Sequence, residues 1–361
     1  MSQLSIARAA PAAAPHVPGK ASVSRTMFLV QATLVPATLY GFWLYGWPAI
    51  FLFLLTVGSC VFWEAACIRM AGRLTKPQLT DGSAILTGWL LALTLPPWAP
   101  WWVAVVGGLL AIVFGKQVFG GIGQNLFNPA MVARVALLVS FPVPLTLWVM
   151  PTPITAAGAP GFIESIHLIT GTVAIPDAVT SASLLGHAKT ELNRGIDLVH
   201  AFAGDHAPVI SWIGARAGSL GESASFLIAA GGLAMFFLGI ISWHIPVAML
   251  LGVVIPAAIG HAVNPARYLD ISAHLLSGGV MLGAFYIATD YVTSPSTDKG
   301  KLIFGFGCGF ITYVIRTWGG YPEGVAFAVV LMNSLTPVID RLTKPRILGR
   351  DKRGRPLQIK D

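Results

Sequence analysis

The sequence predicts an all-α polytopic membrane protein with about ten transmembrane helices. Hydrophobic residues make up 55% of the 361 residues and charged residues only 11%, whereas roughly a quarter of a typical soluble protein is charged. The apolar residues are gathered in long runs, and each helical crossing needs roughly 20 of them. We therefore expect two inverted five-helix halves, with one large extracytoplasmic loop between them.

The apolar runs define the expected helices. In the first half they cover residues 27–46, 48–69, 82–96, 101–120 and 128–150. In the second half they cover residues 225–243, 246–262, 273–290, 302–316 and 323–340. Because each half has an odd number of crossings, any repeat of one half in the other is inverted across the membrane. The third and ninth runs are short and flanked by paired prolines or glycines, so we expect tilted or broken helices there.

Five segments follow from this pattern. They are a disordered polar tail at 1–26, the first transmembrane half at 27–150, the extracytoplasmic loop at 151–224, the second half at 225–341 and a basic tail at 342–361. The first tail is polar and rich in proline and alanine, and it lacks the apolar stretch of a signal peptide. The loop is the one extended stretch of ordinary polar sequence, so chemistry that needs solvent or a soluble partner is expected there.

Basic residues predict the orientation of the chain. Besides the two tails, they lie in short alternate connections: Arg69, Arg73, Lys76, Lys299 and Lys301. The positive-inside rule then places both termini in the cytoplasm and residues 151–224 outside. The net charge of +8 is explained by this distribution, and we expect no binding to nucleic acid.

Metal and nicotinamide binding are not expected. The three cysteines, Cys60, Cys67 and Cys308, all lie in apolar runs and form no CxxC pair, so they do not suggest zinc or iron–sulfur ligation. No glycine-rich dinucleotide fingerprint follows a strand. The glycine-rich stretch at 115–123 has the wrong spacing for a phosphate loop and is interpreted as close helix packing and a turn.

Two Asn-Pro-Ala triplets keep a channel open as the alternative function. They begin at Asn128 and Asn264, and the second is followed by Arg267, as in the second pore motif of aquaporins. The same triplet is also a plain helix start, because asparagine caps a helix and proline fits its first turn. An aquaporin-like channel or another solute transporter is therefore the competing hypothesis.

Three polar residues in or beside apolar runs are candidate contacts for an ion or a cofactor. Glu64 lies in the second run, where a carboxylate is costly unless it is paired or hydrated, so it is either an ion-path residue or a side chain that reaches water. Asp290 and Thr293 end the eighth run in the sequence DYVTSPST. This segment is typical of a turn. Its acid and hydroxyls are also suited to bind the polar edge of a cofactor, and both interpretations stay open.

Several long motifs resemble one family. They are ATDYVTSP at 288–295, GFGCG at 305–309, IRTWGGYPEGVAFAVVLMN at 315–333, DGSAILTG at 81–88, LPP at 95–97 and GQNLFNPA at 123–130. Together they resemble the D subunits of Rnf electron-transport complexes, which are related to the B subunits of sodium-pumping NADH:quinone reductases. The similarity extends over nearly the whole chain outside the two tails.

The resemblance implies a covalent flavin mononucleotide (FMN). In that family its phosphate is esterified to a hydroxyl within a pattern like Asp-x-x-Ser/Thr-Gly-Ala-Thr. Asp177, Thr180, Ser181, Ala182 and Ser183 match the pattern in order, with Ser183 at the acceptor position and Thr180 as the other candidate. Serine replaces the usual glycine at 181 and the usual threonine at 183, and a serine hydroxyl can form the same phosphoester.

The same resemblance implies a setting and partners. It predicts a membrane subunit of an ion-translocating ferredoxin:NAD oxidoreductase in the bacterial inner membrane, with residues 151–224 in the periplasm. The expected partners are the A, B, C, E and G subunits of the complex, a flavin transferase for maturation, and membrane lipid. A second, non-covalent flavin such as riboflavin, reported for the related quinone reductase subunit, is a further expectation that no motif assigns. No catalytic residue and no metal ligand is predicted for this subunit on its own.

Overall fold

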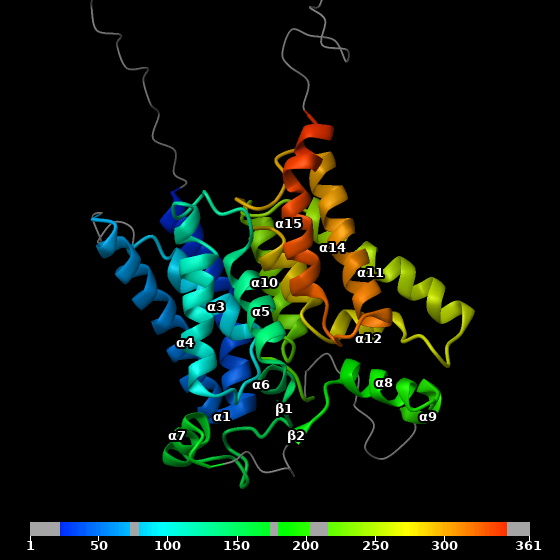
Figure 1. Ribbon diagram of the computed structural model, residues 1–361. Coiled ribbons are helices and arrows are strands. Elements are labelled where there is room, and N and C mark those ends of the chain that lie inside the picture. Colours follow the sequence, from blue (N-terminus) through cyan, green and yellow to red (C-terminus); the bar gives the residue numbers. More distant parts are fainter. Residues whose placement is uncertain (1–21, 73–78, 174–179, 203–215, 345–361) are drawn as a thin grey trace, which may run out of the picture.

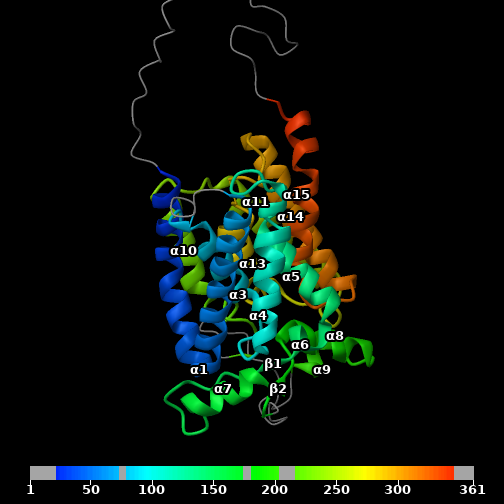
Figure 2. The ribbon, with the colours of Figure 1, turned by 60° about the vertical axis from the view of Figure 1, so that its left-hand side comes forward.

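The computed structural model describes residues 22–72, 79–173, 180–202 and 216–344. They form a bundle of helices that run between two faces (Figures 1 and 2). We call the face at which the first helix begins and the last helix ends the terminal face. The opposite face is the loop face. It carries the two short strands and the small helices α7 (Phe162–Thr170), α8 (Leu184–Asn193) and α9 (Leu198–Ala201).

The first half begins with helix α1, Val23–Met70, which contains both of the first two apolar runs. Gly46 interrupts it with φ 73° and ψ −160°, and Pro48 follows. Each part on either side of the kink has about 24 residues and extends about 36 Å, enough to cross a hydrocarbon core of about 30 Å. Helix α1 therefore accounts for two expected crossings.

The rest of the first half consists of shorter helices. They are α3 (Ser83–Thr94), α4 (Trp101–Leu109) with a π-helical continuation (Leu110–Phe114) and a 3₁₀ turn (Gln117–Phe119), α5 (Pro129–Ser140) and α6 (Pro142–Thr146). The expectation that the fifth run is helical to residue 150 is wrong. Helix α5 ends at Ser140 because Pro142 follows, and after α6 the chain enters strand β1 (Trp148–Val149).

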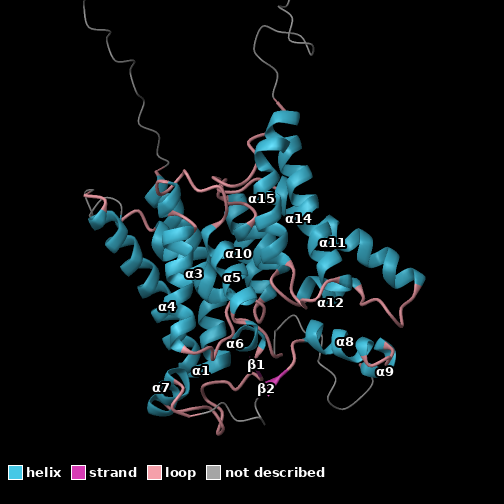
Figure 3. Ribbon diagram, in the orientation of Figure 1, coloured by secondary structure: helices cyan, strands magenta, loops and turns pink. Residues whose placement is uncertain are grey.

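The second half contains four regular helices and one broken one. Figure 3 shows these helices as cyan ribbons. The regular helices are α10 (Ser225–Phe237), α11 (His244–Val263), α14 (Asp298–Trp318) and α15 (Val325–Leu342). The broken helix comprises α12 (Ile271–Leu276), α13 (Val280–Leu282) and a π turn (Gly283–Ile287). Four helical stretches of the described residues are long and apolar enough to cross a membrane: Val23–Met70, Trp101–Phe119, His244–Val263 and Val325–Leu342.

The position of the break corrects the sequence analysis. The ninth run was expected to be tilted or broken, but α14 is an unbroken helix of 21 residues. Its paired glycines, Gly319 and Gly320, follow the helix and do not interrupt it. The eighth run was expected to be continuous, yet it breaks at residues 277–279, where Gly278 adopts φ 67°, a conformation that favours glycine.

Glycines bring α11 and α14 into close contact. A side-chain carbon added at Gly309 would lie 2.0 Å from the carbonyl oxygen of Met249, and one at Gly252 would lie 2.4 Å from that of Phe306. Small residues let transmembrane backbones approach each other in the absence of a strong hydrophobic drive. The glycine-rich GFGCG stretch is therefore a helix-packing surface.

The expected loop is partly structured on the loop face. It contains α7 (Phe162–Thr170), β2 (Thr180–Ser181), α8 (Leu184–Asn193) and α9 (Leu198–Ala201). Strands β1 and β2 pair antiparallel, with Trp148 opposite Ser181 and Val149 opposite Thr180. Residues 216–224 then return into the bundle and are buried, so this last part is not solvent-exposed as a simple loop would be.

Candidate functional sites on the two faces

The hydroxyl-rich motif lies on the loop face. Asp177 falls outside the described residues. Thr180 and Ser181 form β2, Ala182 is exposed, and Ser183 directly precedes α8. Pairing of β2 with β1 fixes this segment against the end of the first transmembrane half.

Ser183 is the N-cap of α8. Its backbone is extended, with φ −63° and ψ 156°, and its Oγ accepts a hydrogen bond from the Gly186 amide at 3.2 Å. The residue is 7% exposed. Free amides and the helix dipole make the beginning of a helix favourable for an anion. The negative charge of a phosphate ester on this hydroxyl would therefore be stabilised.

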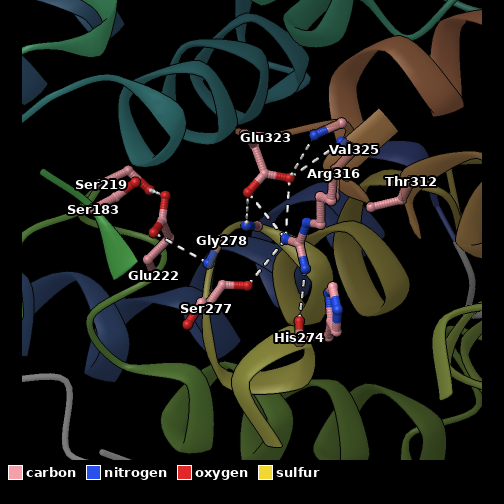
Figure 4. Close-up of polar contacts among 12 residues, drawn as sticks. Ser183, Ser219, Glu222, His274, Ser277, Gly278, Thr312, Arg316, Glu323 and Val325 are labelled. Atoms are coloured by element: carbon pink, nitrogen blue, oxygen red, sulfur yellow. Dashed lines mark hydrogen bonds and ion pairs between the residues drawn. The ribbon is translucent and has the colours of Figure 1, made fainter. Parts of the chain in front are cut away.

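Two carboxylates, the buried Glu222 and the half-buried Glu323, lie beside the broken helix (Figure 4). The Gly278 amide donates to Glu222 Oε2 at 3.1 Å, and the Gly279 amide donates to Glu323 Oε2 at 3.0 Å. Ser219 Oγ also donates to Glu222 Oε1. The two acids thus satisfy amides at the start of α13, where negative charge is favoured.

Arg316 joins this cluster from the end of α14. Its Nη2 lies 3.0 Å from Glu323 Oε2, and the Arg316 side chain is 1% exposed. The same guanidinium donates to the carbonyls of His274 and Ser277. Arg316 therefore holds together three elements of the second half, namely α12, the break and the start of α15.

Two further arginines bring positive charge to the same region. Arg134 on α5 is 5% exposed, and its Nη1 has no hydrogen-bond partner among the described residues. It lines a small cavity with Glu222 and Glu323. Arg216 Nη2 donates to the Glu222 carbonyl. Arg134 of the first half thus lies near Glu222 and Glu323, so charged side chains from both halves meet in one region.

The terminal face carries a second buried ion pair. Lys116 Nζ lies 2.8 Å from Glu64 Oε1, and each side chain is 3% exposed. Lys116 also donates to Ser83 Oγ at 2.7 Å, and Gln117 Nε2 donates to the same Glu64 oxygen. Of the two hypotheses for Glu64, the structure contradicts simple contact with water, because the carboxylate is buried and paired.

The two clusters correspond to each other across the halves. Lys116 lies near the end of the fourth apolar run and contacts Ser83 at the start of a short helix. Arg316 ends the ninth apolar run and contacts Ser277 just before a short helix. This correspondence, on opposite faces, is the arrangement that an inverted repeat produces.

A cavity on the terminal face contains one of the predicted cofactor contacts. Asp290 lines it together with Asn125, Asn128, Lys116 and Tyr286. Asn128 Nδ2 lies 3.4 Å from Asp290 Oδ2. We call this the terminal-face cavity; its walls are mainly apolar, with these polar groups at separate points, as is common for small-molecule sites.

Thr293 holds the Asp290 side chain of this cavity in place. Its Oγ1 donates to Asp290 Oδ2 at 3.3 Å, and its carbonyl accepts hydrogen bonds from Asn333 and Thr336. Thr293 itself does not line the cavity. Its structural role is to fix Asp290 against α15.

The two Asn-Pro-Ala triplets belong to different cavities. Asn128 caps α5 through its Oδ1 and lines the terminal-face cavity. Asn264 ends α11 and, with Arg267, lines a second cavity beside α8. The paired motifs therefore do not face each other in one pore, which removes the basis of the aquaporin analogy.

The fold and the sites define a polytopic helical membrane protein with buried charge clusters near both faces. The family described as NQR2, RnfD, RnfE matches residues 11–349. The chain belongs to this family.

Relatives from several bacteria match over most of their length. The D subunit of the ion-translocating oxidoreductase complex of Stutzerimonas stutzeri is 50% identical over 338 residues, covering 94% of this chain and 95% of the relative. The corresponding D subunit of Rhodobacter capsulatus is 47% identical and covers 84% and 85%. The one from Escherichia coli (strain SE11) is 39% identical and covers 94% and 98%.

Proposed function

We propose that this chain is the membrane subunit of an ion-translocating ferredoxin:NAD oxidoreductase complex of the Rnf type, which relays electrons through FMN bound covalently to Ser183 and couples their transfer to ion transport. The relatives, named as D subunits of an ion-translocating oxidoreductase complex, match almost end to end. The chain acts as part of a translocase and is not catalytic alone. The observation that carries the flavin assignment is a hydroxyl at the N-terminus of α8, on the face opposite the two chain ends.

A bound flavin supplies one-electron and two-electron redox chemistry, and the protein has to orient it and tune its potential. The chain contributes the Ser183 hydroxyl and the amides at the start of α8, where a phosphate is favoured. Strand pairing between β1 and β2 holds the attachment segment against the bundle. Linkage through the phosphate would leave the ring electronically unaltered.

The burial of Ser183 implies an order of events in maturation. A side chain that is 7% exposed is a poor substrate for a separate enzyme. We propose that the flavin transferase acts before α8 docks onto the bundle. Attachment would then precede completion of the fold on this face.

The terminal-face cavity is the proposed site of the second, non-covalent flavin. Asn128 and Asp290 present amide and carboxylate groups in a mainly apolar cavity, which suits a ring with polar edges. Glu64 is the proposed ion contact near the same face, because its Oε2 is buried without a hydrogen-bond partner among the described residues. An isolated buried carboxylate oxygen inside a membrane commonly marks an ion path.

The proposed setting follows the orientation of the basic residues. The terminal face would be cytoplasmic and the loop face, with residues 151–224, periplasmic in the bacterial inner membrane. The partners would be the A, B, C, E and G subunits, the flavin transferase and membrane lipid. A solute channel is not favoured, since the two triplets line separate cavities.

The test is in-gel flavin fluorescence of the denatured full-length chain, co-produced with a flavin transferase. Wild type should show a fluorescent band, Ser183→Ala should show none, and Ser183→Thr should restore it. Thr180→Ala is the matched control and should keep the band. A fluorescent band in Ser183→Ala would refute the acceptor assignment.

A further inference from the structure

A large hollow on the loop face lies between α8 and the second transmembrane half. Its volume is about 660 Å³, and we call it the loop-face cavity. Its walls carry basic and aromatic side chains, among them Lys189, Arg267, Tyr268 and Trp318. A space of this size is in the range of ligand sites of roughly 300–1,000 Å³.

Two residues of its lining carry buried nitrogens that have no partner within the described part of the chain. They are Arg316, through Nε, and His274, through Nδ1. Both residues line the loop-face cavity, and they are 6% and 3% exposed. These two nitrogens have almost no exposed surface, so they do not face the open space. The polar side chains that line it include Asn193, Asn264 and Arg267.

The cavity is continuous with the attachment helix. Leu185, Ala188, Lys189 and Leu192 of α8 line it, at the spacing of one helix face. Leu185 lies only two residues, about 3 Å of helix rise, beyond Ser183. Ser183 itself does not line the cavity, so of a long group tethered there only the far end, and not the point of attachment, can lie in it.

Lys189 fixes α8 over the end of α14. Its Nζ donates to the carbonyls of Tyr321 at 3.0 Å and of Ile315 and Arg316 at 3.4 Å. Partial burial lowers the pKa of Lys189. These contacts set one wall of the cavity against a rigid transmembrane helix and keep the distance between α8 and α14 constant.

We propose that the loop-face cavity holds the isoalloxazine ring of the flavin carried on Ser183, with Trp318 and Tyr268 beside the ring and Arg267 supplying positive charge, while Lys189 positions the carrying helix. This inference rests on the proposed function.

The chemistry of the lining suits such a ring. An aromatic ring packs against aromatic side chains, and positive charge beside a flavin favours its reduced, electron-rich form. Asn193 and Asn264 line the same space, and their side-chain amides can hydrogen-bond to the polar edge of the ring. Arg267 is exposed, so its charge can be removed with little effect on the core.

The experiment uses the full-length flavin-loaded chain in nanodiscs and measures native flavin fluorescence and the midpoint potential. Trp318→Leu and Arg267→Gln are the test variants. Trp101→Leu and Arg194→Gln are the controls. Trp101 is an exposed tryptophan outside the cavity, as Trp318 is an exposed one inside it. Arg194 is an arginine at the end of α8 that pairs with Glu191. Lys189→Gln and Lys189→Arg test the positioning role.

All variants should keep the fluorescent band after denaturation. Trp318→Leu should raise native flavin emission at least twofold, because a quenching neighbour is removed. Arg267→Gln should lower the midpoint potential, and Lys189→Gln should broaden the visible flavin bands, with Lys189→Arg restoring the wild-type spectrum. The controls should match wild type.

The inference fails if Trp318→Leu and Arg267→Gln retain the attached flavin and match wild type in emission and potential. The same variants are also purified from membranes that contain the whole complex. Loss of the other subunits there, with unchanged flavin spectra, would show that the cavity binds a partner segment and would also overturn the inference. A fluorescent Ser183→Ala protein would instead refute the proposed function, so the two failures are distinguishable.

Discussion

Lys116 and Glu64 form an ion pair of 2.8 Å inside the apolar bundle, with each side chain only 3% exposed. Ser83 accepts a further hydrogen bond from the same ammonium group. Burying two charges is costly even when they are paired, and removing one partner leaves the other uncompensated. The pair therefore makes a strong prediction about single and double substitutions.

Lys116→Met alone and Glu64→Gln alone should each lower the free energy of unfolding by about 3–5 kcal/mol. The double variant should lose less free energy of unfolding than the two single variants lose together, because it leaves no unpaired charge. Chemical unfolding in detergent micelles measures all three. Strictly additive losses would show that the two side chains do not interact.

Arg316→Lys should destabilise the second half although the charge is kept. A lysine ammonium cannot reproduce the planar set of donors that contacts His274, Ser277 and Glu323. We expect a loss of about 2–3 kcal/mol from several missing hydrogen bonds to a charged group. A melting temperature equal to that of wild type in the same micelles would contradict this role.

Gly309→Ala should disrupt the contact between α11 and α14. The added carbon would lie 2.0 Å from the Met249 carbonyl oxygen, so the backbones must separate, and overpacking of this kind costs about 1–3 kcal/mol. Gly58→Ala is the matched control in α1, where no atom of the described chain would lie within 4 Å of the added carbon. It should be neutral or slightly stabilising, and thermal unfolding compares the two.

Asn128→Leu should lose the non-covalent flavin and keep the covalent one. The substitution removes both the cap of α5 and a polar group of the terminal-face cavity. The measurement is flavin released into the supernatant on acid precipitation, against flavin retained in the pellet. If wild type and variant release the same amount of flavin, the terminal-face cavity does not bind the non-covalent flavin.

Much of the helical framework was predictable because a membrane imposes a simple rule. Every backbone group must be satisfied within a helix, so long apolar runs such as the one that forms α11 show where helices lie. The kink at Gly46 was also signalled, since the two expected runs were separated at that point. The resemblance to the flavin-attachment pattern singled out Ser183, which the structure places at the start of α8; its role as acceptor stays a prediction.

The buried charge clusters could not be assembled from the sequence. Glu64 and Lys116 are 52 residues apart, and nothing local indicates that they meet. Arg316 lay in one of the family motifs, and Glu222 lay in the segment that was interpreted as a loop. A charged residue inside or beside an apolar run was the available signal, but its partner depends on how the two halves pack.

The position of the broken helix was missed for a related reason. Paired glycines occur both after Trp318 and after Ser277, and the local sequence does not tell an interruption from an ending. The interruption at Gly278 and Gly279 is stabilised by Glu222 and Glu323, which come from distant parts of the chain. Tertiary partners thus decided between two equivalent local patterns.

The most direct test of the central claim is fragmentation mass spectrometry of the proteolytic peptide that contains Ser183, taken from the native membrane complex. The account predicts an added mass equal to FMN less one water, localised to Ser183. An unmodified peptide, or the same added mass localised to another residue, would contradict it.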